Sequence, residues 1–169
     1  DSKSLVMIDQ VSGVVRWVFR TNPFDRKEVF SRPIMTEQRV YCGTPDGNIC
    51  GLDTSDGRHL WTFFGLSRTS PDFAYSQDTD TIFSGGTEGI LRKRSLMVAL
   101  DGVGGVLRWQ APLDQISHTS PLYSDHDGGL IVVIGDQGGV YGLDARSGEE
   151  RFRFAIRGWV PGNPVMLDM

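Results

Sequence analysis

One stretch of the sequence decides the fold: Gly51-Leu52-Asp53-Thr54-Ser55-Asp56-Gly57-Arg58-His59-Leu60-Trp61. Its Asp-x-x-x-Gly-x-x-x-Trp spacing occurs four times in the chain, with phenylalanine in place of tryptophan in the last copy. The aspartates of successive copies lie 44, 48 and 43 residues apart, a period that predicts one supersecondary unit repeated along the chain. The four copies are Asp9, Gly13 and Trp17; Asp53, Gly57 and Trp61; Asp101, Gly105 and Trp109; and Asp144, Gly148 and Phe152.

Each unit reads as four short strands. An apolar run with a glycine turn precedes each later copy, as in Val40-Tyr41-Cys42-Gly43, and a Ser, Thr or Asn close to a proline stands further upstream, as in Thr119-Ser120-Pro121. Four strands in about 43 residues, joined by short turns and without helical periodicity, match one blade of a β-propeller. We therefore expect an all-β chain, a single propeller segment over residues 1–169. It would hold three full four-stranded antiparallel blades at about 30–65, 68–113 and 118–157, with partial blades at 1–22 and 162–169.

The motif has a structural explanation. An aspartate at the end of a strand accepts hydrogen bonds from the backbone of the next turn, and glycine four residues later suits a turn position with positive φ. A tryptophan in the following strand has a large ring that can cover the seam to the neighbouring blade. We therefore assign all twelve motif residues to the repeat and expect no catalytic role for them.

Composition excludes some classes of function. The 169 residues carry a net charge of −4, which disfavours a nucleic-acid partner because such partners select a basic face. No apolar run approaches the roughly 18 residues of a membrane span. The count of 21 glycines is high and agrees with many tight turns between short strands.

The quoted stretch resembles the tryptophan-docking motif of the PQQ-like propeller repeat, whose pattern is roughly Ala-x-Asp-x-x-Thr-Gly-x-x-x-Trp. Residues 99–109 match it equally well, residues 142–152 match with Phe152 for the tryptophan, and residues 7–17 keep the three landmarks. The family includes quinoprotein dehydrogenases, scaffold lipoproteins of outer-membrane assembly, luminal stress-sensing domains of kinases and propeller tails of adenylating enzymes. Many members are periplasmic or luminal and some are cytosolic, so the resemblance favours a periplasmic, luminal or secreted location and leaves a cytosolic one open.

Propellers of this family usually close with six to eight blades, so the resemblance implies an incomplete ring here. Two arrangements would complete it. The chain is a fragment whose remaining blades belong to a larger propeller, which we favour, or it is a protomer that completes the ring as a homo-oligomer. In either case its partner is protein, and we expect a non-enzymatic scaffold for binding or assembly.

The alternatives are part of a PQQ-dependent dehydrogenase or the propeller tail of a larger multidomain enzyme. A dehydrogenase would imply a bound quinone, Ca²⁺ on carboxylate and amide ligands, a general-base aspartate and often two adjacent cysteines. The chain has no Cys-Cys pair, and turns account for its aspartates. The stretch Asp125-His126-Asp127-Gly128-Gly129 lacks the distal ligands of a calcium loop and is interpreted as a hairpin turn. We therefore expect no cofactor, with PQQ and Ca²⁺ required only by the dehydrogenase alternative.

Two features remain outside the repeat. Arg92-Lys93-Arg94-Ser95 lengthens one connection by about five residues, which fits either a solvated hairpin or a partner-binding loop. Cys42 and Cys50 flank the 44–48 turn symmetrically and are expected to face each other across two strands. Either a disulfide or two buried thiols would fit this placement, and we favour the thiols because cysteine packs as a small apolar residue.

Overall fold

The computed structural model describes residues 4–20, 31–44, 47–66, 68–69, 72–89, 94–114, 119–158 and 163–165. These residues form four antiparallel sheets that follow one another along the chain. The described part contains fifteen β-strands and one single-turn 3-10 helix, so the prediction of an all-β chain of antiparallel blades is confirmed.

The first two sheets contain six strands. The N-terminal sheet is a hairpin, and the second sheet is a four-stranded meander in sequence order. Their strands are β1 (Ser4–Ile8), β2 (Val15–Arg20), β3 (Ile34–Met35), β4 (Arg39–Gly43), β5 (Ile49–Asp53) and β6 (His59–Phe63).

The third and fourth sheets contain the other nine strands. In the third sheet the two short strands β7 and β8 both pair with the same neighbour, β9, so they form two pieces of one edge. The strands are β7 (Arg68–Thr69), β8 (Ala74–Ser76), β9 (Thr81–Glu88), β10 (Arg94–Asp101), β11 (Leu107–Leu113), β12 (Leu122–Ser124), β13 (Leu130–Ile134), β14 (Gly139–Asp144) and β15 (Glu150–Ala155).

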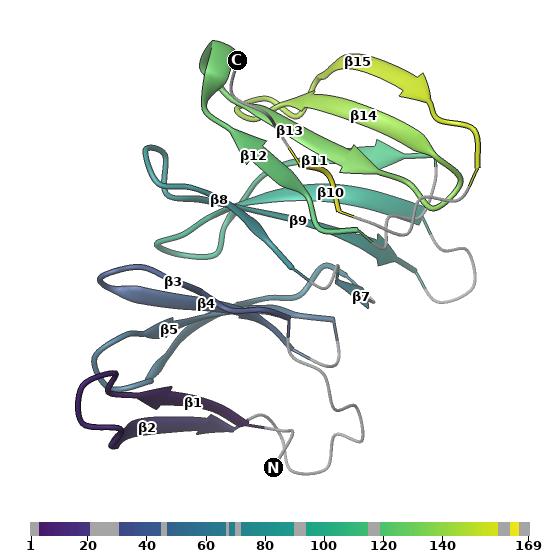
Figure 1. Cartoon of the computed structure of the whole chain (residues 1–169). Helices are drawn as coiled ribbons and strands as arrows, with labels where there is room; N and C mark the ends of the chain where they lie inside the picture. The colour runs from purple at the N-terminus through teal and green to yellow at the C-terminus, as the bar shows by residue number, and fades with distance from the viewer. Residues whose placement is uncertain are drawn as a thin grey trace.

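The sheets lie face to face in chain order. Figure 1 shows the β1–β2 hairpin at one end of the molecule and the β12–β15 sheet at the other, with the second and third sheets between them. The turns of the two terminal hairpins, β1–β2 and β14–β15, point to the same side of the molecule (Figure 1). Among the described residues, no helix is long and apolar enough to cross a membrane.

Three apolar clusters fill the three seams between these sheets. Strands of the inner sheets supply residues to both of their faces: Val40 and Cys42 of β4 pack toward the first sheet, whereas Tyr41 between them packs toward the third. This two-sided burial explains why such strands read as continuous apolar runs rather than as an alternation. Each cluster contains one tryptophan, and these are Trp17, Trp61 and Trp109.

Candidate protein-interaction site

The same tryptophan contact joins each pair of neighbouring sheets. An indole from the last strand of one sheet lies on the final turn of the next sheet and donates its N–H to a backbone carbonyl there. The carbonyl belongs in every case to the residue after the motif aspartate. The N–O distances are 2.9 Å from Trp17 to Thr54, 3.1 Å from Trp61 to Gly102 and 3.0 Å from Trp109 to Ala145.

Glycine makes room for each indole. The motif glycines have φ between +66° and +75°, a conformation that side chains with a Cβ rarely adopt. A Cβ added to Gly105 would stand 2.3 Å from the nearest atom of Trp61, and one added to Gly57 or Gly148 would stand 2.5 Å from the docked indole. Glycine is therefore required at the three docked positions for two reasons: its backbone adopts a positive φ, and the absence of a Cβ leaves room for the indole.

The motif aspartate holds the turn that receives the indole. The Oδ1 atom of Asp144 accepts the N–H groups of Arg146 and Ser147 at 2.9 Å each, and its Oδ2 atom pairs with the Arg151 guanidinium. The hydrogen bond from Arg151 and that from the Ser147 backbone lower the pKa of Asp144 to about 2. The pKa values of the other three motif aspartates are lowered as well. The largest cause is the Ser12 backbone N–H at Asp9, the Ser55 side chain at Asp53 and the Arg108 guanidinium at Asp101.

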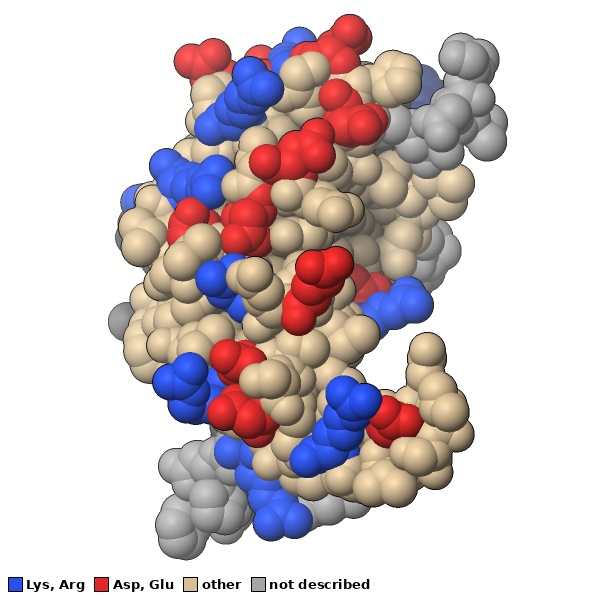
Figure 2. Space-filling view, turned by 90° about the vertical axis from the view of Figure 1, so that its left-hand side faces the viewer, with Lys and Arg blue, Asp and Glu red and all other residues tan. Residues whose placement is uncertain are grey.

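An arginine accompanies each of these carboxylates. The ion pairs are Arg16–Asp9, Arg58–Asp53, Arg108–Asp101 and Arg151–Asp144. Figure 2 shows acidic and basic side chains interspersed along this side of the molecule, from one end to the other. The edge of the molecule that carries the motif turns therefore has many charged side chains, but each motif carboxylate has a positive charge beside it.

At both ends of the stack of sheets, one half of the tryptophan contact meets no partner among the residues that the structure describes, and we call these two faces the open seams. At the N-terminal end, Gly13 has φ +71° like the other motif glycines, but a Cβ placed on it would meet no described atom within 4 Å. At the C-terminal end, Phe152 occupies the tryptophan position and is 40% exposed, whereas Trp17, Trp61 and Trp109 are 8–9% exposed. Phe154, two residues along β15, is 54% exposed and stacks on Phe152 at 6.0 Å between ring centroids.

The outward face of the N-terminal hairpin is also apolar. Leu5, Met7 and Phe19 pack against the second sheet. The alternate residues Val6, Ile8 and Val18 point the other way and are 43%, 55% and 44% exposed. Each end of the stack therefore presents aliphatic or aromatic side chains where the inner sheets have a neighbour.

Polar contacts also join neighbouring sheets at the edge formed by their first strands, away from the tryptophans in their last strands. Ser120 donates its Oγ–H to Asp72 at 2.8 Å and its backbone N–H to the Asn163 side chain at 2.9 Å. These three residues come from three successive repeats. The motif spacing alone predicts no role for them. Ser120 and Asn163 both stand directly before a proline, and this shared register is the signal in the sequence that points to them.

Asp80 links the second and third sheets. Its Oδ1 atom accepts the hydroxyls of Tyr41 and Tyr75 at 2.9 Å each, and its Oδ2 atom lies 3.5 Å from the Arg39 guanidinium. Burial, together with the hydrogen bond to Asp80, raises the pKa of Tyr75 to about 12. Both tyrosine hydroxyls therefore stay protonated at neutral pH and donate their hydrogen bonds to Asp80 at the contact between the two sheets.

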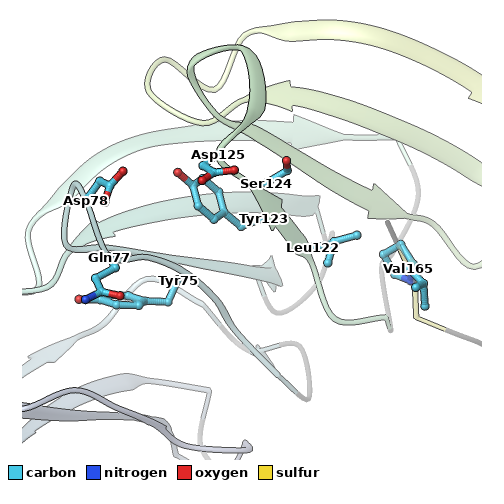
Figure 3. Close-up of a pocket in the computed structure, with 9 residues that line it drawn as sticks. Tyr75, Gln77, Asp78, Leu122, Tyr123, Ser124, Asp125 and Val165 are labelled. Carbon is cyan, nitrogen blue, oxygen red and sulfur yellow. The ribbon is translucent and has the colours of Figure 1, made fainter. Parts of the chain in front are cut away.

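A cavity of about 650 Å³ lies between β8 and β12 (Figure 3). Its two aromatic walls are Tyr75 and Tyr123, and the Tyr123 hydroxyl accepts a hydrogen bond from Ser76 at 3.0 Å. Figure 3 shows Asp78 at one end of this cavity and Val165 at the other, with Asp125 beside Tyr123 between them. The remaining lining residues are Gln77, Leu122, Ser124 and Pro164.

The other predicted candidates fall at separate places. Arg94 is the exposed first residue of β10, opposite Glu88, while Arg92 and Lys93 lie outside the described residues. Residues 126–128 form the exposed 3-10 turn between β12 and β13. Cys42 and Cys50 face each other across β4 and β5 and are buried thiols. Within the described ranges, no three His, Cys, Asp or Glu side chains converge in a way that could hold a metal ion.

Solved structures share this fold. BamB from Moraxella catarrhalis is similar with a TM-score of 0.69 and 20% identity over 96% of this chain and 49% of that one. The quinohemoprotein alcohol dehydrogenase from Comamonas testosteroni gives a TM-score of 0.75 and 15% identity over 93% of this chain and 33% of that one. A second such dehydrogenase, ADHIIG from Pseudomonas putida HK5, gives 0.69 and 16% over 91% and 32%. The chain thus spans about half the length of the BamB structure, and the predicted incomplete propeller is confirmed.

Sequence comparison identifies the family. No curated protein matches the chain. A family model described as outer membrane protein assembly factor BamB matches residues 1–125, which is well over half of the sequence and includes three of the four motif copies. The resemblance of the Asp-Gly-Trp motif to the PQQ-like repeat agrees with this match, and the chain belongs to the BamB-like family of PQQ-repeat β-propellers.

Proposed function

We propose that the chain is a non-enzymatic scaffold that binds other polypeptides through the open seams at its two ends. The observation that carries this proposal is the contrast in exposure at the docking position: 8–9% for the three tryptophans that have a neighbouring sheet and 40% for Phe152. Exposed apolar surface at a place where equivalent surface is buried favours association with a matching partner.

The partner best suited to these seams is another blade. A blade with an Asp-x-x-x-Gly turn would accept Phe152, and a blade with an aromatic residue in its last strand would cover Gly13. The remaining blades of a larger propeller would satisfy both ends, as would a second copy of the chain that completes the ring. The family description, an outer membrane protein assembly factor, supports a role in protein assembly. The resemblance to the PQQ-like repeat family supports a periplasmic, luminal or secreted location. The net charge of −4 supports protein rather than nucleic acid as the partner.

Sedimentation velocity over a 100-fold range of concentration tests the self-association arm. If a second copy is the partner, the mass should rise with concentration, and the rise should disappear in the Phe152→Asp and Phe154→Asp variants. Val103→Asp is the matched control, because Val103 is 58% exposed but lies in the β10–β11 turn. A chain that remains monomeric throughout rejects the second copy as partner.

Photo-crosslinking tests the scaffold role itself. A benzophenone amino acid at position 154 should crosslink to a polypeptide blade in the protein expressed in its native host, whether that blade is in the same or another chain. The same label at position 103 should not. Equal yields at the two positions would reject the open seam as a binding surface.

The second candidate function is part of a quinoprotein dehydrogenase. It is favoured by the structural similarity to the Comamonas enzyme and by the cavity between β8 and β12. We assign no step of that reaction to residues of this chain. Addition of pyrroloquinoline quinone and Ca²⁺ to the complete protein, followed by absorbance spectroscopy and dye reduction with alcohols, separates the two candidates. A complete protein that retains no quinone rejects the enzyme.

A further inference from the structure

Cys42 and Cys50 are the closest pair of reactive groups in the seam between the first two sheets. They are directly opposite residues in the antiparallel β4–β5 pair, and their Sγ atoms lie 3.0 Å apart. Their side chains are 0% and 1% exposed. Each thiol therefore has the other as its nearest partner, in a place that bulk solvent does not reach.

The backbone at this pair suits a covalent bond. Opposite residues of an antiparallel pair have Cα atoms about 4.5 or 5.5 Å apart, and both values fall within the roughly 4.4–6.8 Å that a disulfide spans. The sulfurs need to approach by about 1 Å to reach the bond length of about 2.05 Å. No rearrangement of the sheet is needed, since the two side chains already point into the same cluster as Val40 and Leu52.

The indole of Trp17 belongs to that cluster as well. It reaches the cluster from β2 and is anchored by its hydrogen bond to Thr54 at 2.9 Å. The first sheet therefore lies over the thiols, and an oxidant reaches them only when this sheet moves away from the second one or before the two have packed. Contact with the Cys50 thiol and burial also raise the pKa of Cys42, so the thiolate that attacks a disulfide is scarce in the closed seam.

We propose that Cys42 and Cys50 form an intramolecular disulfide, and that opening of the seam beneath Trp17 controls the rate at which it forms. The oxidant is a disulfide, such as oxidised glutathione or the active-site disulfide of an oxidised dithiol oxidase. One cysteine attacks it to give a mixed disulfide and the second cysteine displaces the leaving thiol. Two S–H bonds break and one S–S bond forms, while the oxidant takes up two electrons and two protons and leaves as two thiols.

The bond can be mapped by proteolysis. Asp46 stands between the two cysteines, so cleavage before aspartate yields peptides 25–45 and 46–52 with one cysteine each. The protein is refolded from denaturant in an oxidised glutathione buffer, quenched in acid, denatured and treated with maleimide before digestion. We expect the two peptides joined, 2 Da below their reduced sum and free of maleimide. Separate peptides that each carry maleimide or glutathione, or a link between two molecules, overturn the disulfide.

The rate in the already folded protein tests the control by the seam. Trp17→Ala should speed disulfide formation at least tenfold, while Trp109→Ala, which alters the seam between the third and fourth sheets, should leave the rate unchanged. Equal acceleration by the two variants would show that global unfolding exposes the thiols and would overturn the control by Trp17. The refolded sample decides the existence of the bond independently of this result.

Discussion

The indole of Trp61 occupies the space in which a side chain on Gly105 would begin. The two residues are 44 positions apart in the sequence, on different sheets, and a Cβ on Gly105 would lie 2.3 Å from the indole. The positive φ of Gly105 adds an independent reason for glycine at this position.

The two reasons can be measured separately. Gly105→Ala should lower the free energy of unfolding by about 2–4 kcal/mol, because it combines left-handed backbone strain with overpacking of the seam. Gly13→Ala has the same strain without the clash, and should cost about 1–2 kcal/mol in the isolated chain. Urea denaturation checks both values. Equal losses in the two variants would show that the indole yields to the added methyl group.

Truncation of a docking tryptophan should be among the most destabilising changes in the chain. Trp109→Ala removes a 9% exposed ring and should cost about 3–5 kcal/mol, while Trp109→Phe keeps a ring but leaves the Ala145 carbonyl without its donor, at about 1–3 kcal/mol. Phe152→Ala is the control, and because its ring is 40% exposed it should cost less than Trp109→Ala does. A loss for Phe152→Ala as large as that for Trp109→Ala would mean that a partner covers its face under the conditions of the measurement.

Residue spacing was enough to predict the blades, but it did not predict how exposed the aromatic side chain at the tryptophan position of each blade is. The period of the aspartates places the strands, and the sheets have β5 ending at Asp53 and β14 ending at Asp144. The exposure of Phe152 depends on the presence of a neighbouring sheet, which no local pattern reveals. The hydrogen bonds from Ser120 to Asp72 and Asn163 depend on the offset between sheets and join residues 48 and 43 positions apart. Periodicity fixes the strands along the chain, whereas the packing between sheets fixes these contacts.

Stability should fall in acid through the motif carboxylates. The pKa of Asp144 is about 2 in the folded chain, below its ordinary value of 3.8. Its ionised form therefore contributes stability that is fully present above pH 4 and is lost as the pH falls toward 2. Asp144→Asn should be less stable than the parent chain at pH 7, and the difference should shrink between pH 4 and pH 2. Chemical denaturation across that range is the measurement, and Asp78→Asn, at an exposed carboxyl in the β8–β9 turn, is the control. A difference that stays constant from pH 7 to pH 2 would contradict the role of the Arg151 ion pair.

Asp80 should influence the titration of the tyrosines that it binds. In Asp80→Asn, the pKa of Tyr75 should fall from about 12 but remain above its ordinary value of 10, since burial is the larger cause of the shift. Tyrosinate absorbance during an alkaline titration measures this, and Tyr75→Phe identifies the transition. An unchanged midpoint in Asp80→Asn would mean that burial alone sets the pKa.

The tryptophan contact has a consequence for how such a chain can change in length. Every repeat brings both halves of the contact, an aromatic residue for the sheet that follows and a glycine turn for the sheet that precedes. A gene duplication that inserts one period, between 43 and 48 residues, therefore adds a complete seam and leaves the existing ones intact. Rings of different size can arise from one repeat in this way, since each new blade needs to fit only its two neighbours.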